Sequence, residues 1–280
     1  MIAGVSIPYL GAVPVMVCGR SETASVEKTL DRLGESEFSR RVLVAGGNYF
    51  YVVGFLRDIS ELDRFVEFAK REAEIPEPTV GIYCLDDGLM PDYSVDGYGK
   101  RRQSYKELSP LDLKIIATLK DNARRPTAEI AHMVRASTKT VRRHLEEMMS
   151  EGSLDMSVPI DGASGGDMLL VAHVNLKDGV DKKEFGRRLL SKHQFDDAYA
   201  RTFSNLPGLV VWVFWSSKMA EVRKALKEVS EDEDVLAVMP NFVYLERIYL
   251  TTWRDKLPEV QVAALKKLRT RRSCSGRKTR

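Results

Sequence analysis

The sequence contains few of the residues that build metal sites, disulfide frameworks or hydrolytic centres. Among its 280 residues there are 3 cysteines and 4 histidines. Cys18, Cys84 and Cys274 lack metal-ligand spacing, and their odd number argues against a disulfide framework. Neither a Ser-His-Asp set nor a phosphate-binding glycine loop stands out. We therefore expect no metal, no cofactor and no enzymatic activity.

Long apolar stretches are also absent. No apolar run is long enough to cross a membrane, and the N-terminus lacks the basic start and cleavage site of a signal peptide. Hydrophobic residues make up 44% of the chain and charged residues 30%, as in soluble globular proteins. We expect a cytoplasmic protein of more than one domain, without a membrane partner.

The net charge of +3 is unevenly distributed along the chain. From Lys266 to the end there are eight cations and no acid, and from Lys100 to Gly152 there are twelve cations and seven acids. A polyanion is expected to bind where positive charge is concentrated. The C-terminal run alone is equally compatible with a solvated tail and with a DNA-binding tail.

The segment 109–154 has the pattern of three short helices. Ser109, Thr127 and Ser137 are candidate helix caps, and Gly152 is a candidate stop. Apolar residues repeat at helical spacing after each cap. Three short helices separated by tight turns, the third rich in cations, predict a helix-turn-helix.

Both flanking segments alternate strands and helices in the order β-α-β-β-α-β, which is typical of a ferredoxin-like fold. The fold class predicted is therefore α+β, with an internal duplication. The helices of such a domain cover one face of its sheet, so the other face needs another layer or another subunit. The predicted domains are 1–85 (ferredoxin-like), 86–107 (linker), 108–158 (winged helix-turn-helix), 159–252 (ferredoxin-like) and 253–280 (basic helix, beginning at Pro258, and tail).

Short motifs in the central segment carry a family resemblance. They are Leu111-Asp112-x-Lys114-Ile115-Ile116, Asn122-Ala123-Arg124-Arg125, Glu129-Ile130-Ala131, Ser137-Thr138-x-Thr140-Val141-x-Arg143 and Glu151-Gly152. In this order they resemble the DNA-binding domain of the Lrp/AsnC family, the feast/famine regulators of bacteria and archaea. Residues 44–66 resemble the central hairpin and second helix of that family's ferredoxin-like effector domain, called RAM.

The resemblance implies a transcriptional regulator that binds double-stranded DNA and forms dimers through RAM sheets. It also implies a possible small-molecule effector site at the hairpin, with Gly46, Gly47, Asn48 and Tyr49 as candidates. The domain order departs from the family, because RAM-like domains lie on both sides of the helix-turn-helix. The chain begins where a family member would just be leaving its winged helix.

The two RAM-like domains can pair within one chain or between chains. We favour a homodimer, because a single winged helix gives a short, weakly discriminating footprint. The candidate DNA-binding residues are Arg124, Arg125, Thr127, Ser137, Thr138, Lys139, Thr140, Arg142 and Arg143. Among them, Arg142 suits base readout, since a guanidinium can bond guanine O6 and N7 together, whereas Arg124 and Arg125 suit phosphate contacts.

Three alternatives stay open. The basic helix could be a solvated face of a winged helix that binds protein. Sirohaem decarboxylases resemble this family and use the same modules, and they would need histidine and arginine side chains converging on a tetrapyrrole. A small-molecule sensor without DNA affinity is the third.

Overall fold

The computed structural model describes residues 2–85, 89, 106–157, 167–195 and 197–262. The chain forms two compact units, each built from separate stretches. The sheet unit comprises Gly11–Ser94 and Ile160–Thr252, and the winged-helix unit comprises Met1–Leu10, Val95–Pro159 and Trp253–Arg280. Most of the predicted linker and the predicted tail lie outside the described residues. In the described ranges no helix combines the length and apolarity needed to span a membrane.

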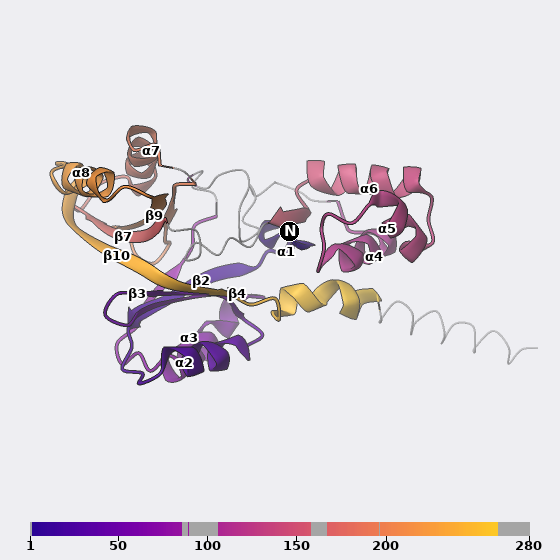
Figure 1. Cartoon of the computed structure of the whole chain (residues 1–280), viewed down its shortest axis with the longest axis horizontal. Helices are drawn as coiled ribbons and strands as arrows, with labels where there is room; N and C mark the ends of the chain where they lie inside the picture. Colours follow the sequence, from indigo (N-terminus) through magenta and orange to yellow (C-terminus); the bar gives the residue numbers. More distant parts are fainter. Residues whose placement is uncertain (1, 86–88, 90–105, 158–166, 196, 263–280) are drawn as a thin grey trace, which may run out of the picture. The chain divides into compact units, whose positions relative to one another are not determined.

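The sheet unit contains two β-α-β-β-α-β repeats, as the sequence predicts (Figure 1). The first consists of β2 (Val13–Arg20), α2 (Val26–Gly34), β3 (Ser39–Ala45), β4 (Tyr49–Leu56), α3 (Leu62–Glu72) and β5 (Thr79–Ile82). The second consists of β7 (Met168–Leu176), α7 (Lys182–Lys192), β8 (Tyr199–Thr202), β9 (Leu209–Ser216), α8 (Met219–Ser230) and β10 (Val235–Ile248). The predicted α+β class is confirmed.

One eight-stranded sheet runs through both repeats in the order β5-β2-β4-β3-β10-β7-β9-β8. Each half has the strand order of a ferredoxin-like domain, and the halves join where β3 pairs antiparallel with β10. At the two outer edges Tyr83 forms an antiparallel bridge with Phe203. The Cys84 N–H donates to the Thr202 carbonyl beside it, at 2.9 Å. The sheet therefore closes on itself, and its edges are paired within the chain.

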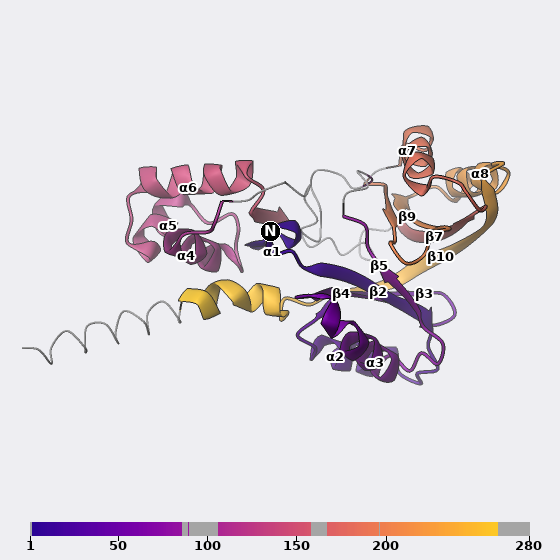
Figure 2. The same ribbon diagram turned by 180° about the vertical axis from the view of Figure 1, so that it is seen from behind.

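The inner face of this sheet carries a shared core. Met16, Leu43 and Val53 of the first half pack in one cluster with Val171 and Val213 of the second. On the opposite face of the second half another cluster lies beneath α7 and α8, and α2 and α3 lie on the other side of the first half (Figure 2). The sheet face that required another layer or subunit is thus covered by the other half of the same chain.

The winged-helix unit is assembled from three separate stretches. Its elements are β1 (Ile2–Val5), α1 (Ile7–Leu10), α4 (Pro110–Leu119), α5 (Thr127–Val134), α6 (Thr138–Ser150), β6 (Leu154–Ser157) and a helix at 253–262. β1 and β6 pair antiparallel, with Ala3 opposite Met156. The first residues of the chain therefore supply one strand of the wing and belong with the central helices.

The C-terminal helix begins five residues earlier than predicted, at Trp253 and not at Pro258. The added turn contains Arg254 and Asp255, which are charged yet buried. Charged residues count as surface in a periodicity argument. Their burial depends on partners far away in the sequence, which local pattern does not reveal.

Candidate nucleic-acid interface

The first helix of the three begins with a reciprocal cap. The Ser109 hydroxyl accepts from the Asp112 N–H at 3.2 Å, and the Asp112 carboxylate accepts from the Ser109 N–H at 2.7 Å. Pro110 occupies the first turn. Ile115, Ile116 and the apolar faces of α5 and α6 form one buried cluster. This packing fixes the direction of α6 relative to the other two helices.

The candidate recognition helix, α6, is capped by Ser137. Its hydroxyl accepts from the Thr140 N–H at 3.1 Å and lies 2.8 Å from the Thr140 hydroxyl. Val141 and Met148 are buried. Ser137 and Thr140, both predicted to contact DNA, are therefore engaged in shaping the start of the helix.

The predicted contact residues Thr138, Lys139, Arg142 and Arg143 are all exposed on α6. Lys139 and Arg142 form no side-chain hydrogen bond or ion pair with any described residue. They stand three positions apart on the same face, so their charges repel, and cations near a helix N-terminus oppose the helix dipole. Two neighbouring cations at this end of the helix do not stabilise the fold, but they would favour the binding of an anion.

Arg143 is held by the protein. One guanidinium nitrogen lies 2.7 Å from a Glu147 carboxylate oxygen, and another donates to His144 Nε2 at 3.1 Å. Lys106 also pairs with Glu147, at 3.2 Å. The ion pair occupies part of the hydrogen-bonding capacity that a base contact would need.

His144 connects α6 to the cap of α4. Its Nδ1 lies 2.6 Å from the Asp112 carboxylate, and both side chains are largely buried. Burial by itself would raise the pKa of Asp112, but hydrogen bonds from Ser109 and His144 outweigh it and hold the pKa below its usual value. The carboxylate thus serves the helix cap and the histidine at once.

The residues near α5 that were predicted to contact phosphates differ in whether their side chains already contact other protein groups. Arg124 is exposed and its side chain has no partner among the described residues. Arg125 is half-buried, donates from Nε to the Thr118 carbonyl at 3.0 Å and pairs with Glu129. Thr127, the first residue of α5, is half-buried. Arg124 is consequently the cation of this turn that is available to a phosphate, and Arg125 braces α4 against α5.

Arg135 is a further cation that the sequence analysis missed. It ends α5 in a left-handed conformation, with φ 56° and ψ 52°, and its side chain is exposed in the turn before α6. It has no side-chain partner among the described residues. Glycine or asparagine adopts this left-handed conformation more easily than arginine does. An arginine at such a position therefore indicates a role for its side chain besides forming the turn.

The candidate effector hairpin is a tight turn, and most of its polar groups that could bind a ligand already form contacts within the protein. Gly47 and Asn48 have positive φ, 71° and 56°, as in the two-residue turns that match sheet twist. The Asn48 carbonyl accepts from Ser21, and the Gly46 N–H donates to Phe242, at 2.8 and 3.1 Å. Tyr49 is half-buried and its hydroxyl faces the Cys18 sulfur at 3.7 Å.

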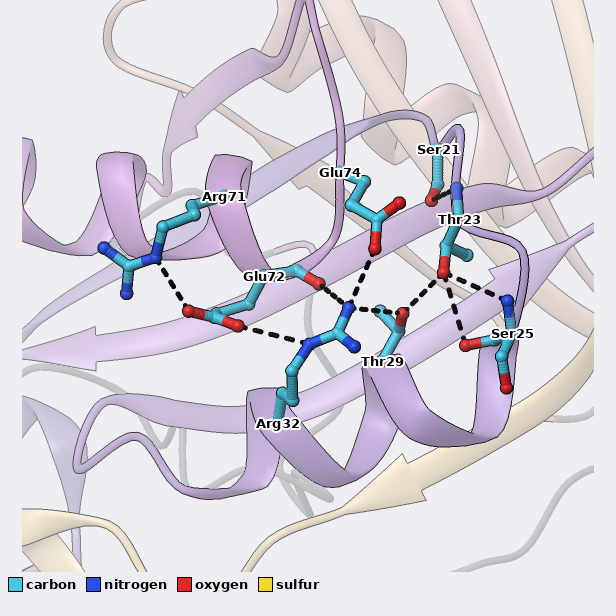
Figure 3. A network of polar contacts seen from close by, with 8 residues as sticks. All are labelled: Ser21, Thr23, Ser25, Thr29, Arg32, Arg71, Glu72 and Glu74. Atoms are coloured by element: carbon cyan, nitrogen blue, oxygen red, sulfur yellow. Dashed lines mark hydrogen bonds and ion pairs between the residues drawn. The ribbon is translucent and has the colours of Figure 1, made fainter.

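A cavity of about 500 Å³ lies in the first half of the sheet unit. It adjoins a network in which the Arg32 guanidinium contacts Glu72 at 3.2 Å, Glu74 at 3.0 Å and the Thr29 hydroxyl at 3.1 Å (Figure 3). None of the four predicted hairpin residues lines it. The lining residues are Glu22, Glu67, Lys70, Arg71, Glu74, Ile75 and Pro76.

No cluster of metal-ligating side chains occurs in the part of the chain that the structure describes. Three of the four histidines there are engaged, each with a different partner. His173 lies 2.9 Å from the Tyr51 hydroxyl inside the sheet, His193 is buried beside Trp212, and His144 is bound to Asp112. His132 is exposed on α5.

Comparison with known proteins gives two kinds of similarity. The family model described as winged helix-turn-helix DNA-binding matches residues 108–152. The sirohaem decarboxylase NirDL shares the fold over 95% of this chain and 83% of its own, at 15% identity and a TM-score of 0.60. Its complex with an iron-uroporphyrin III analogue gives 13% identity, the same coverage and a TM-score of 0.61.

E. coli AsnC covers 49% of this chain, and 93% of AsnC is covered, at 18% identity and a TM-score of 0.40. Comparison with curated proteins gives no match. The chain contains a winged helix-turn-helix that the family model matches, and its two ferredoxin-like domains and winged helix share the fold of NirDL.

Proposed function

We propose that this chain is a transcriptional regulator of Lrp/AsnC type that reads double-stranded DNA by placing the N-terminal half of α6 in the major groove. The observation that carries the proposal is the pair of exposed cations Lys139 and Arg142, which have no partner among the described residues and stand at the capped start of that helix. Helix N-termini offer backbone N–H groups to phosphate, and side chains beyond them reach base edges.

Within this proposal the cations have different roles. Arg142 reads a base, Lys139 and Thr138 contact bases or phosphates near the helix start, and Arg124 fixes register through a phosphate. Arg143 contributes charge near the groove while it remains paired with Glu147. Ser137 and Thr140 contribute by fixing the conformation of the first turn of α6.

Gel-shift titrations of two variants test the proposal. Arg142→Ala should weaken binding to a selected site by roughly 1–3 kcal/mol and relax its sequence preference. Arg124→Ala should weaken binding to all duplexes and flatten the dependence on salt. Wild-type affinity in both variants would refute the assignment of these surfaces.

The proposal extends to effector response, which the hairpin turn supports only through backbone groups and Asn48. An effector that binds there should change DNA affinity in the wild type, and an Asn48→Asp variant should alter that change. Absence of any DNA affinity at low salt would favour a sensor or a protein-binding winged helix in place of a regulator.

A second candidate function is tetrapyrrole chemistry, favoured by the fold similarity to NirDL over nearly the whole chain. Such an enzyme needs histidine and arginine side chains facing one open site. The described cavity has no histidine in its lining. Titration of the purified protein with an iron uroporphyrin, followed by absorbance, distinguishes the two. A saturable spectral change would support the enzyme.

A further inference from the structure

Two long side chains in the described part of the chain are held in a left-handed backbone conformation. The non-glycine residues there with positive φ are Asn48, Glu74, Arg135 and Asp197. Asparagine and aspartate adopt this conformation at low cost, whereas longer side chains are strained in it. The strain at Glu74 and Arg135 therefore has to be offset by what their side chains do.

Glu74 uses its side chain within the protein. Its carboxylate lies 3.0 Å from Arg32 Nη2, and the same guanidinium lies 3.2 Å from the Glu72 carboxylate and donates to the Thr29 hydroxyl at 3.1 Å (Figure 3). Arg32 thereby connects the end of α3 to α2. The left-handed residue at position 74 is thus explained by contacts inside the chain.

Arg135 has a similar backbone but no such side-chain contact. The turn that contains it is tight: the Arg135 N–H donates to the His132 carbonyl at 3.3 Å, and the Ala136 N–H donates to the Ala131 carbonyl at 3.0 Å. Ala136 also packs against the winged-helix core, and Ser137 caps α6. These contacts impose the left-handed conformation, which glycine would adopt more easily.

The Arg135 guanidinium is exposed and forms no hydrogen bond, ion pair or ring contact with a described residue. It lies in a region of positive charge, because Lys139 and Arg142 follow on α6 and the first turn of that helix contains no acid. An arginine here therefore destabilises the turn, and nothing in the described part of the chain offsets this. An anion bound to the guanidinium would offset it.

The position of Arg135 relative to Arg124 indicates an extended anion. The two arginines flank α5, with Arg124 before its first residue and Arg135 directly after its last. The helix between them is about 12 Å long, which is more than three times the rise of about 3.4 Å per nucleotide of one DNA strand. The two guanidinium groups therefore suit separate phosphates of one polyanion better than a single small anion.

We propose that Arg135 binds a backbone phosphate of the duplex that α6 enters, at the end of α5 opposite Arg124. The inference rests on the proposed function and adds to it a contact that reads no base. In helix-turn-helix proteins the helix before the recognition helix crosses the DNA backbone, and a guanidinium can donate to two oxygens of one phosphate together. Phosphate contacts at both ends of α5 would fix how α6 is placed in the groove.

Three variants separate the charge of Arg135 from its effect on the backbone. Arg135→Gln removes the charge and keeps a long side chain in the left-handed position, and Arg135→Gly removes both. The control Arg223→Gln removes one positive charge at an exposed position of α8, in the sheet unit. Dissociation constants are measured for a selected duplex and an unrelated duplex between about 50 and about 200 mM KCl, and thermal unfolding is followed for each protein.

We expect both Arg135 variants to lose affinity for the two duplexes by the same factor. The slope of log K against log salt should become shallower by about 0.9, the value for one phosphate contact, while the control keeps the wild-type slope. Arg135→Gly should also raise Tm by roughly 2–4 °C, because glycine relieves the backbone strain, whereas Arg135→Gln should leave Tm close to that of the wild type.

Three results would overturn the inference: an unchanged slope in Arg135→Gln, an equal change of slope in the control, or a Tm of Arg135→Gly at or below that of the wild type, since the arginine would then stabilise the turn itself. The proposed function stands in each case if Arg142→Ala still weakens binding to the selected duplex. Lack of duplex binding by the wild type at about 50 mM KCl would overturn both.

Discussion

Arg142 and Arg143 are adjacent on α6 and carry the same charge, but only Arg143 forms side-chain contacts with described residues of the protein. Arg143 contacts Glu147 and His144, whereas Arg142 has no side-chain partner among the described residues. Moving Arg143 onto DNA would first require breaking an ion pair, although an exposed pair of this kind costs little, about 0–1 kcal/mol. Arg142 carries no such cost and is the better base reader.

His144 has its protonation pattern set by its two neighbours. Nε2 can accept from Arg143 only when it carries no proton, so Nδ1 carries the proton and donates to Asp112. Asp112 in turn accepts from the Ser109 N–H. A chain of hydrogen bonds therefore runs from the exposed face of α6 to the cap of α4.

The buried His173 makes the stability of the sheet dependent on pH. Burial lowers its pKa to about 4 from 6.5, so the folded protein resists protonation that the unfolded chain accepts. The free energy of unfolding should therefore rise with pH between about 4 and 6.5. The contribution is at most about 3 kcal/mol. Denaturant unfolding followed at a series of pH values measures it.

His173→Gln is the matched variant, because an amide can still bond the Tyr51 hydroxyl but does not titrate. Its unfolding free energy should vary less with pH over the same interval. Some variation will remain, since burial also lowers the pKa of His193. Identical pH profiles in variant and wild type would show that His173 is not the origin.

At the scale of elements, the junction of β3 and β10 contains a buried ion pair. Arg41 Nε lies 2.7 Å from a Glu246 carboxylate oxygen, and the side chains are 3% and 2% exposed. Removing one partner leaves a buried charge. We expect Glu246→Leu alone to lower the free energy of unfolding by roughly 3–5 kcal/mol.

The double variant Arg41→Leu, Glu246→Leu separates pairing from packing. Replacing a buried pair by apolar residues is often close to neutral, so the double variant should recover most of the stability lost in the single one. Chemical denaturation of the three proteins measures the coupling. Additive losses would mean that the two side chains stabilise the junction independently.

The order of helices and strands could be predicted well from the sequence, because hydrophobic periodicity and helix caps depend on residues that are close together in the chain. Ser109 and Ser137 cap α4 and α6 as predicted, whereas the N-cap of α5 is Pro126 and not the predicted Thr127. The pairing of β1 with β6 could not be predicted in the same way, since it joins residues about 150 positions apart. The bracing of Arg125 and Arg143 also depends on tertiary neighbours. The surface of the candidate site could thus be predicted from the sequence. Which of its cations form hydrogen bonds or ion pairs within the protein could not.

At the scale of the whole molecule, the duplication gives a sheet unit that is closed within one chain. The inner faces of both halves share one core, and the edge strands meet at Tyr83 and Phe203. Pairing of the halves within one chain and pairing between chains satisfy the same strand pattern, so the sequence alone does not distinguish them. Pairing within the chain leaves these faces and edges unavailable to a second copy.

The described residues contain one winged helix, which leads to a prediction about assembly on DNA. A single head contacts too few base pairs to discriminate strongly among genomic sites, so we expect two chains on each selected duplex, joined by surfaces other than the inner sheet faces. Binding-site selection should return two related half-sites about 10 bp apart, or a multiple of that spacing. Light scattering should give a protein mass twice the 31.6 kDa of one chain. A single unrepeated site bound by one chain would contradict the prediction, and specificity would then have to come from Arg142 and Lys139 of one molecule.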